Sequence, residues 1–373
     1  MEMKKSCTTR RFSPEGQTAF EARYEAQKIA FGPVVFQCVR YAWKRGILQA
    51  LADAGSFGCS VESLEHSGKW SGYALKVVLE SCLSAGVVQQ HDDHYVLDKV
   101  GYCFLSDNIT QANYDFVSDV CYEGLAQLDR SLDAQKPLGL KALGPWSTLY
   151  EGMSSLPEPA KSSWFAFDHL YSDTSFPLIL PDVLATAPRQ VMDVGANTGK
   201  FSHAVLQASP SVRVHLVDLP QQLNVAKGRL QGAGLVDRTQ MYPIDLLDAS
   251  ARLPRGMDLV WMSQFLSCFS EDAIESILSR VTASLNDQGQ VLILDTFWDR
   301  QNYDIASYCL INTSPYFTAI ASGNSKVYES SDYIRLCRKV GLELVSVRDG
   351  IGYCHSLMRF IRCDRRDKAE PCA

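Results

Sequence analysis

The chain of 373 residues is long enough for two domains, and its composition, 46% hydrophobic and 21% charged, is ordinary for a globular protein. The net charge of −6 argues against a general binder of polyanions, and no stretch stays apolar over the roughly 18 residues that a membrane span needs. Twelve scattered cysteines, with no Cys-x-x-Cys pair, fit small buried side chains in a reducing cytosol, so we expect a cytoplasmic protein.

Residues 16–110 are predicted to be mostly helical, after a disordered leader that lacks the apolar core of a signal peptide. Apolar residues between Val34 and Leu51 recur at helical spacing, and shorter helices are expected near 60–64 and 73–85. Gly86 is expected to end the last of these helices. Three helices followed by a β-hairpin are typical of a winged-helix domain.

The hairpin is predicted from two apolar runs, residues 87–90 and 95–97, that flank His91-Asp-Asp-His94. The two histidines have a spacing that metal sites also use. No further ligands accompany them, so we interpret them as part of a solvated turn and expect no metal ion.

Residues 111–180 are predicted to be connecting helices that contribute to a substrate pocket. They carry an aromatic cluster that could form core or stacking surface for a planar substrate. Its members are Trp146, Tyr150, Trp164, Phe165, Phe167, Tyr171 and Phe176.

Residues 181–363 alternate between strand and helix patterns, which predicts an α/β domain with a doubly wound, mostly parallel sheet of seven strands. The expected strands are 190–194, 212–217, 239–243, 257–262, 291–296, 342–348 and 356–362. The expected helices are 199–208, 220–233, 271–285 and 331–340. No helix separates the last two strands, so the final strand is expected to be an antiparallel edge strand. Residues 364–373 are expected to form a disordered polar tail.

A glycine turn follows the first of these strands, in Asp193-Val-Gly-Ala-Asn-Thr-Gly199, and Asp218 ends the second strand. A glycine turn lets backbone N–H groups approach a ligand, and an acid at the next strand end can accept hydrogen bonds from ribose hydroxyls. The pattern lacks the third glycine of a dinucleotide fingerprint and the Gly-Lys-Ser/Thr of a phosphate-binding P-loop. It therefore indicates a different nucleotide-like ligand.

The order of motifs resembles the dimeric S-adenosylmethionine (SAM)-dependent O-methyltransferases of small phenolic and polyketide molecules, over nearly the whole chain. Arg45-Gly-Ile-Leu-Gln-Ala-Leu51 and Tyr95-Val-Leu-Asp-Lys-Val-Gly101 resemble the family's dimerisation domain. The resemblance implies SAM as cofactor, a small-molecule acceptor and a homodimer. It also implies a set of SAM-binding residues: Asp193, Gly195, Asn197 and Gly199 in the turn, Asp218 and Leu219 at the ribose, and Asp245 and Leu246 at the adenine.

Two positions depart from the family pattern. Asn197 replaces a glycine, but asparagine tolerates a positive φ better than most residues, so the turn is expected to survive. The family's general-base histidine is also missing, because Ser267 stands in its place, followed by Cys268 where the family has aspartate. A neutral serine is a poor proton acceptor. Three explanations stay open: another group acts as the base, the acceptor arrives ionised, or the reaction differs.

Asp168-His169 supplies the candidate catalytic pair, together with Ser267 as a group that could orient the acceptor. Four aromatic residues surround the pair in Trp164-Phe-Ala-Phe-Asp-His-Leu-Tyr171, and a desolvated histidine there could act as the base. The alternative is a hydrogen-bonded core histidine beside a surface aspartate. Phe165 and Tyr171 are candidate substrate-binding residues. Asn312 and Tyr316 are further candidates, because they lie where the family places helices over the substrate.

The sequence therefore predicts a homodimeric methyltransferase that acts on an oxygen, or on a ring carbon, of a small aromatic or polyketide-like acceptor. Apolar residues at Val34, Phe36, Val39 and Ile47 exceed what three short helices and a hairpin would bury alone. One rival is a family member that keeps SAM but has lost methyl transfer. A second is a winged-helix regulator, but residues 71–85 carry a single lysine, Lys76, and DNA binding needs clustered basic residues. Neither a nucleic acid nor a membrane is expected as a partner.

Overall fold

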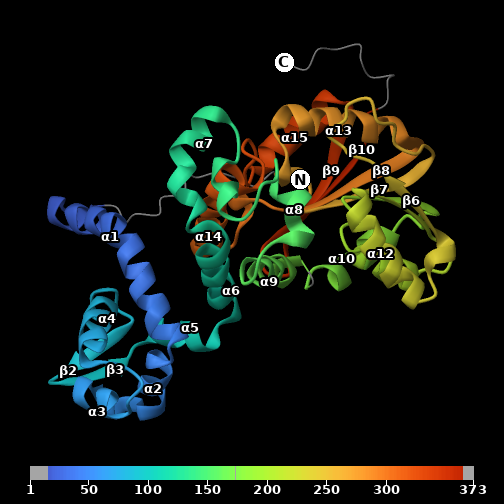
Figure 1. Ribbon diagram of the computed structural model, residues 1–373. Helices are drawn as coiled ribbons and strands as arrows, with labels where there is room; N and C mark the ends of the chain where they lie inside the picture. Colours follow the sequence, from blue (N-terminus) through green and yellow to red (C-terminus); the bar gives the residue numbers. More distant parts are fainter. Residues whose placement is uncertain (1–15, 173, 364–373) are drawn as a thin grey trace. The chain divides into compact units, whose positions relative to one another are not determined.

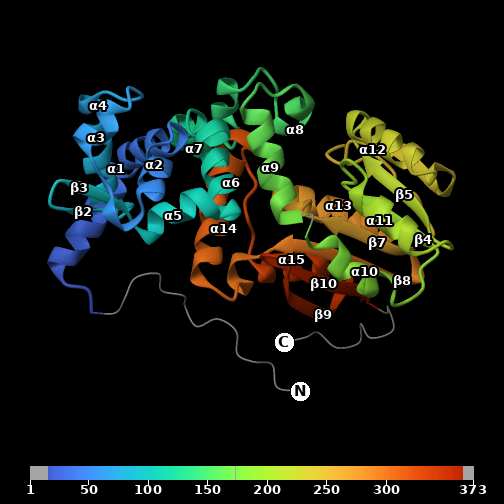
Figure 2. The same ribbon diagram turned by 90° about the horizontal axis from the view of Figure 1, so that it is seen from below.

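The computed structural model describes residues 16–172 and 174–363, so the predicted leader and tail lie outside the described residues (Figures 1 and 2). The chain divides into two compact units at the peptide bond between Asp115 and Phe116. We call residues 16–115 the N-terminal unit and residues 116–363 the C-terminal unit. Within the described ranges, no helix is long and apolar enough to cross a bilayer.

The N-terminal unit is a bundle of helices with a small antiparallel sheet. Its helices are α1 (Ala19–Lys44), α2 (Ile47–Ala54), α3 (Val61–His66), α4 (Gly72–Ser84), α5 (Lys99–Ser106) and the start of α6 (Asn108–Phe116). Its strands are β1 (Cys59–Ser60), β2 (Val88–His91) and β3 (His94–Leu97), in the order β1-β3-β2. The predicted hairpin and the end of α4 before Gly86 are both present.

The predicted helix over Val34–Leu51 is two helices in the structure. Residue Gly46 separates α1 from α2 with a φ of +80°, a backbone conformation that side-chain-bearing residues rarely adopt. At its other end α1 begins at a capping box, in which the Thr18 hydroxyl and the Glu21 carboxylate each bind the other residue's backbone N–H. Apolar periodicity alone did not detect the break, because it continues in phase through the glycine.

The C-terminal unit contains the seven-stranded sheet, which confirms the predicted fold class. Its strands are β4 (Gln190–Val194), β5 (Arg213–Asp218), β6 (Thr239–Pro243), β7 (Met257–Ser263), β8 (Leu285–Thr296), β9 (Leu342–Ile351) and β10 (His355–Arg362). The order is β6-β5-β4-β7-β8-β10-β9, with the first five strands parallel to one another. Chain order therefore reverses between β4 and β7, the kind of position where doubly wound sheets bind ligands.

One prediction about this sheet was wrong. The final strand, β10, is antiparallel as expected, but it lies between β8 and β9 rather than at the edge. Its central position fits its burial, since most of its side chains are buried, whereas β9 alternates toward solvent. The side chains of β10 reach the cores on both faces of the sheet, Met358 and Phe360 on one side and Leu357 on the other.

Helices cover both faces of this sheet (Figures 1 and 2). One face packs against α13 (Glu271–Ser284) and α15 (Ser330–Lys339). The other packs against α10 (Phe176–Leu184), α11 (Lys200–Ala208) and α12 (Pro220–Gly232). Successive strand residues alternate between the two cores, as Val260 and Trp261 of β7 do.

A third core lies between residues 116–172 and the insertion after β8. It joins α8 (Leu149–Gly152) and α9 (Ala160–Ser172) to α14 (Asp304–Tyr316), and α7 (Leu128–Ala134) lies beside it. Much of the predicted aromatic cluster is found here. Phe116 stacks on Phe167 with ring centroids 4.0 Å apart, and Trp164 donates a hydrogen bond to the Tyr316 hydroxyl at 2.8 Å.

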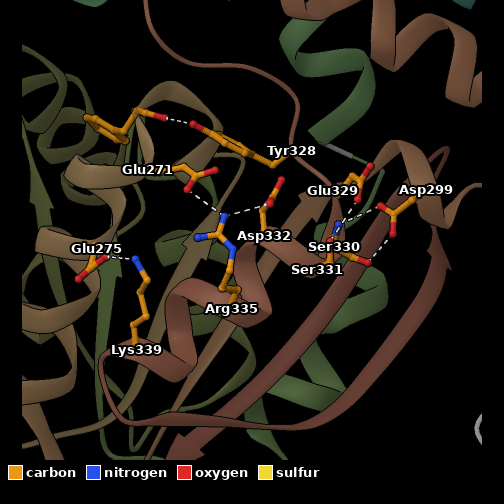
Figure 3. Close-up of polar contacts among 11 residues, drawn as sticks. Glu271, Glu275, Asp299, Tyr328, Glu329, Ser330, Ser331, Asp332, Arg335 and Lys339 are labelled. Atoms are coloured by element: carbon orange, nitrogen blue, oxygen red, sulfur yellow. Dashed lines mark hydrogen bonds and ion pairs between the residues drawn. The ribbon is translucent and has the colours of Figure 1, made fainter.

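Polar contacts hold α15 against α13 (Figure 3). Arg335 binds Glu271 at 2.8 Å, and one turn further along Lys339 binds Glu275 at the same distance. These surface ion pairs are individually weak. They join the first turns of α13 to α15. The segment directly before α13 contains Ser267, the residue that stands in place of the family's histidine base.

Candidate functional site

The predicted glycine turn connects β4 to α11. Gly195 has a φ of +73°, and a Cβ atom there would lie 2.2 Å from Cδ2 of Phe265, so both conformation and space require glycine. Asn197 adopts a φ of +48°, the positive value expected for an asparagine that replaces a glycine. Gly199 closes the turn, with its N–H donating to the Ala196 carbonyl at 2.8 Å.

Asp218 ends β5 beside this turn. The backbone N–H of Asn197 donates to one of its carboxylate oxygens at 2.7 Å, and that of Leu219 donates to the other at 2.7 Å. Burial raises the pKa of Asp218, and the two N–H groups oppose that rise. Each oxygen keeps lone-pair capacity, so the carboxylate can accept two more hydrogen bonds from a diol.

Asp193, in the strand directly before the turn, holds the start of the helix that follows the turn. Its carboxylate is buried and accepts a hydrogen bond from the Ser202 hydroxyl, in the first turn of α11, at 2.5 Å. Burial raises its pKa to about 7, and the nearby charge of Asp218 adds to the rise. The side chain therefore anchors the start of α11 within the protein interior.

The segment after β6 lies against the same strand ends. The N–H of Ile244 donates to the Asp218 carbonyl at 3.0 Å, which ties the segment to β5. Leu246 is buried, and its carbonyl accepts a hydrogen bond from Arg280 of α13 at 2.5 Å. Asp245 is exposed, and its carboxylate accepts only the Leu247 N–H among the hydrogen bonds of the described residues. The structure thus brings all eight predicted SAM-binding residues to one end of the sheet.

The turn that replaces the family's base is η7 (Leu266–Cys268), and it is fixed at both ends. The buried carboxylate of Asp295 accepts the Ser267 N–H and also the Tyr333 hydroxyl, the latter at 2.8 Å. After the turn, the Phe269 carbonyl accepts the Tyr328 hydroxyl at 2.7 Å (Figure 3). This segment is therefore held in one conformation, although no histidine is present.

Cys268 belongs to a group of side chains that we call the tyrosine cluster: Tyr150, Asp168, Cys268 and Tyr316. Tyr316 is buried and the other three are partly buried. The Tyr150 hydroxyl lies against the Cys268 thiol, and Asp168 is within electrostatic range of the other three members. Burial raises the pKa of Cys268 to about 12, so the thiol is neutral at physiological pH. Asp218 also acts electrostatically on Cys268.

Asp168 and His169 take different surroundings, although both belong to α9. Asp168 belongs to the tyrosine cluster, whereas the His169 ring lies 5.7 Å from the Phe165 ring. Successive residues of an α-helix point about 100° apart around the helix axis, so neighbouring side chains such as Asp168 and His169 rarely contact the same group. Phe165 also contacts Trp164 edge-on at 5.2 Å.

The other predicted substrate residues are dispersed. Tyr316 is a member of the tyrosine cluster, and its hydroxyl accepts from Trp164. Tyr171 packs against Phe167 and Tyr353. Asn312 is exposed and donates to the Tyr308 carbonyl of its own helix at 2.8 Å. A hollow of about 590 Å³ between α10 and α11, which includes Lys200, contains none of the predicted site residues.

In the sequence, Tyr150 stands out only as one member of the aromatic cluster of residues 146–176. Nothing in its local pattern distinguishes it from core aromatics, because its meeting with Cys268 joins residues 118 positions apart. No group of three or more histidine, cysteine, aspartate or glutamate side chains in the described part of the chain is placed to hold a metal ion.

The residues at the strand ends fit SAM. The Asp218 carboxylate has spare acceptor capacity for a ribose diol, and the buried Oδ1 of Asn197 has no hydrogen-bond partner among the described residues. A buried polar atom without a partner is costly, and a polar ligand at the turn would remove that cost.

Two family models match the chain, and together they cover more than half of it. A Dimerisation2-like domain matches residues 23–95, and an O-methyltransferase domain matches residues 178–343. Each match falls within one of the two units described above.

Similar proteins span almost the same length. An L-tyrosine C(3)-methyltransferase of Streptomyces lavendulae is 21% identical over 84% of this chain and 85% of its own. A 3-amino-4-hydroxybenzoate 4-O-methyltransferase of Streptomyces cremeus is 24% identical over 83% and 82%. The crystal structure of the apo S-adenosylmethionine-dependent methyltransferase SibL shares the fold, with a TM-score of 0.67 and 21% identity over 91% of this chain and 99% of that one.

Proposed function

We propose that this chain, which belongs to the SAM-dependent O-methyltransferases of the dimeric small-molecule type, methylates an oxygen or a ring carbon of a small aromatic acceptor. One observation carries the proposal. Asp218, which accepts the Asn197 N–H of the glycine turn, lies within electrostatic range of Cys268, a member of the tyrosine cluster. A site for a ribose-bearing ligand and a site for a polar aromatic molecule therefore adjoin.

When bound, SAM supplies an electrophilic methyl group on a positively charged sulfur. We propose that Asp218 accepts the ribose hydroxyls, that Asp245 accepts from the adenine, and that Leu246 packs against the ring. Gly195 permits the close approach of the backbone. The chain then has to orient the acceptor and exclude water, and such positioning can supply much of the rate acceleration.

An aromatic acceptor is supported by the surroundings of the tyrosine cluster. Trp164, Phe165 and Tyr316 supply ring faces and edges beside Asp168, and flat rings stack on such surfaces. The relatives named above act on a phenol ring carbon and a phenol oxygen. We propose Asp168 as the proton acceptor, with His169 as the alternative base and Ser267 as an orienting group.

Ligand binding and methyl transfer test this function. Calorimetry with the purified protein should detect SAM and S-adenosylhomocysteine, but not nicotinamide dinucleotides, because the turn lacks the dinucleotide fingerprint. Incubation with SAM and either L-tyrosine or 3-amino-4-hydroxybenzoate, read by mass spectrometry, should give a product 14 mass units heavier, roughly one CH₂. Tight nicotinamide dinucleotide binding, or absence of SAM binding, would remove the assignment.

A homodimer is the proposed assembly, and of the four residues expected to argue for it Val34 is exposed. Val39 and Ile47 are buried within the N-terminal unit itself, and Phe36 stacks on Tyr114. The exposed large apolar side chains of α1 are Val34 together with Phe20, Tyr24, Ile29, Phe31 and Tyr41, of which Phe20 and Ile29 are 81% and 80% exposed. Large apolar side chains on one helix favour a protein partner.

Light scattering should therefore find a dimer at micromolar concentration. Obligate interfaces commonly bury more than about 2,000 Å². Replacing both Ile29 and Phe31 by lysine should shift the protein toward monomer, whereas Lys227→Glu, at an exposed position of α12 in the C-terminal unit, should not. A wild-type protein that is monomeric at that concentration contradicts the proposal.

A further inference from the structure

The Tyr150 hydroxyl is buried and has no nitrogen or oxygen partner among the described residues. Its ring lies partly exposed on the short helix α8, and it packs against the core that contains Trp164 and Tyr316. Its neighbour is the Cys268 thiol, which is a weak hydrogen-bond acceptor. A buried hydroxyl that forms only this contact loses its hydration without full compensation, so a ligand oxygen there would satisfy it.

The segment that carries this hydroxyl contacts the helix that follows the predicted ribose acid. Met153 follows α8, and its sulfur accepts a hydrogen bond from Gln222 at 3.8 Å. Gln222 belongs to the first turn of α12, which begins directly after Asp218 and Leu219. The segment from Tyr150 to Met153 thus contacts α12, which follows Asp218, and the Tyr150 hydroxyl lies against Cys268 of η7.

The charges around this position create a chemical problem for a phenol acceptor. Asp168, Asp218 and Asp295 all act electrostatically on the Cys268 thiol. Negative carboxylates disfavour a nearby phenolate, so they oppose the ionisation that precedes methyl transfer. A neutral hydrogen-bond donor aimed at the acceptor oxygen would offset this effect, as donors do at developing oxyanions.

We propose that the Tyr150 hydroxyl donates a hydrogen bond to the acceptor's phenolic oxygen and so takes over part of the role of the missing acid–base pair. The inference rests on the function proposed above and adds a residue to its site. The titratable groups that face Tyr150 are Cys268, Tyr316 and Asp168. Burial keeps the pKa of the Tyr150 hydroxyl well above its usual range, so it stays protonated and acts as a donor rather than as a base.

The step balances with groups already named. A lone pair on the acceptor oxygen forms the bond to the methyl carbon, and the methyl–sulfur bond breaks with its electron pair remaining on sulfur. The phenolic proton passes to Asp168. If the adjacent ring carbon attacks instead, the same hydrogen bond stabilises the oxygen as it gains carbonyl character. The proton on that carbon is lost afterwards to the base.

Tyr150→Phe tests the proposal, because it removes the hydroxyl and keeps the ring. With an acceptor found in the methyl-transfer assay, kcat/KM should fall roughly 10²-fold, while SAM affinity by calorimetry stays unchanged. A second readout is independent of turnover. In the complex with S-adenosylhomocysteine, the chromophoric phenol 4-nitrocatechol should have a lower pKa with the wild type than with Tyr150→Phe.

Tyr114→Phe is the matched control, since it also removes a buried tyrosine hydroxyl, which donates to the Phe36 carbonyl in the N-terminal unit. It should leave both readouts at wild-type values. Thermal unfolding identifies any variant that fails to fold, and Cys268→Ala offers a second perturbation of the same contact. Equal behaviour of 4-nitrocatechol with wild type and Tyr150→Phe overturns the proposal. If methyl transfer by the wild type is nevertheless detected, the proposed function stands, and only the role of Tyr150 is removed.

Discussion

Replacing Asp218 by alanine is expected to weaken SAM binding by on the order of 10- to 100-fold, or about 1.5–3 kcal/mol. The carboxylate is the proposed acceptor for two ribose hydroxyls, and hydrogen bonds to a charged acceptor are stronger than neutral ones. It also accepts the N–H groups of Asn197 and Leu219, so its loss leaves two backbone donors without their partner. Calorimetric titration with SAM and with S-adenosylhomocysteine measures the change.

Asp237→Ala serves as the matched control, because Asp237 is an exposed aspartate that precedes β6, at the opposite end of the strand from the site. Asp218→Asn keeps the side-chain volume and removes the charge, which separates lost ribose contacts from a distorted turn. Unchanged SAM affinity in both Asp218 variants would remove this residue, and with it the proposed ribose site, from the assignment.

Replacing Asp168 by asparagine is expected to lower turnover by about 10²–10⁴-fold, with little change in SAM affinity. The carboxylate lies in the tyrosine cluster, within electrostatic range of Tyr150, Cys268 and Tyr316, and asparagine cannot accept the acceptor's proton. His169→Ala should have the smaller effect, because its ring lies against Phe165. Ser267→Ala should also matter less, since a hydroxyl there only orients the acceptor. The measurement is a pH–rate profile of each variant with an identified acceptor.

The opposite order of effects would assign the base to His169 instead. A third outcome has a separate meaning: if both variants stay active and the rate follows the acceptor's own pKa, the acceptor is ionised before it binds. Neither side chain then takes the proton. Each result distinguishes one of the explanations that the missing histidine leaves open.

Much of the fold could be predicted because its signals are local. The strands β4 and β6 begin and end at the predicted residues, and α13 begins at the predicted residue, Glu271. Apolar residues repeat roughly every 2 residues in a strand and every 3.6 in a helix because of the geometry of the element itself. These patterns can therefore be recognised from a single segment, without knowing what packs against it. The break at Gly46 was missed because one glycine does not disturb that period.

The residues of the candidate site likewise fall into those that local motifs predict and those that only tertiary contacts bring together. The proposed SAM-binding residues lie in short motifs at strand ends, so the sequence by itself could name Asp218 and Asp245 as candidates. The insertion of β10 between β8 and β9 depends on pairing between distant segments, and no local pattern encodes it. Nor does one encode the meeting of Tyr150, Asp168 and Cys268, which come from three separate elements. Their burial and their mutual electrostatic effects exist only after α8, α9 and η7 pack together. Tertiary structure alone therefore decided which polar groups adjoin the proposed site of the methyl donor.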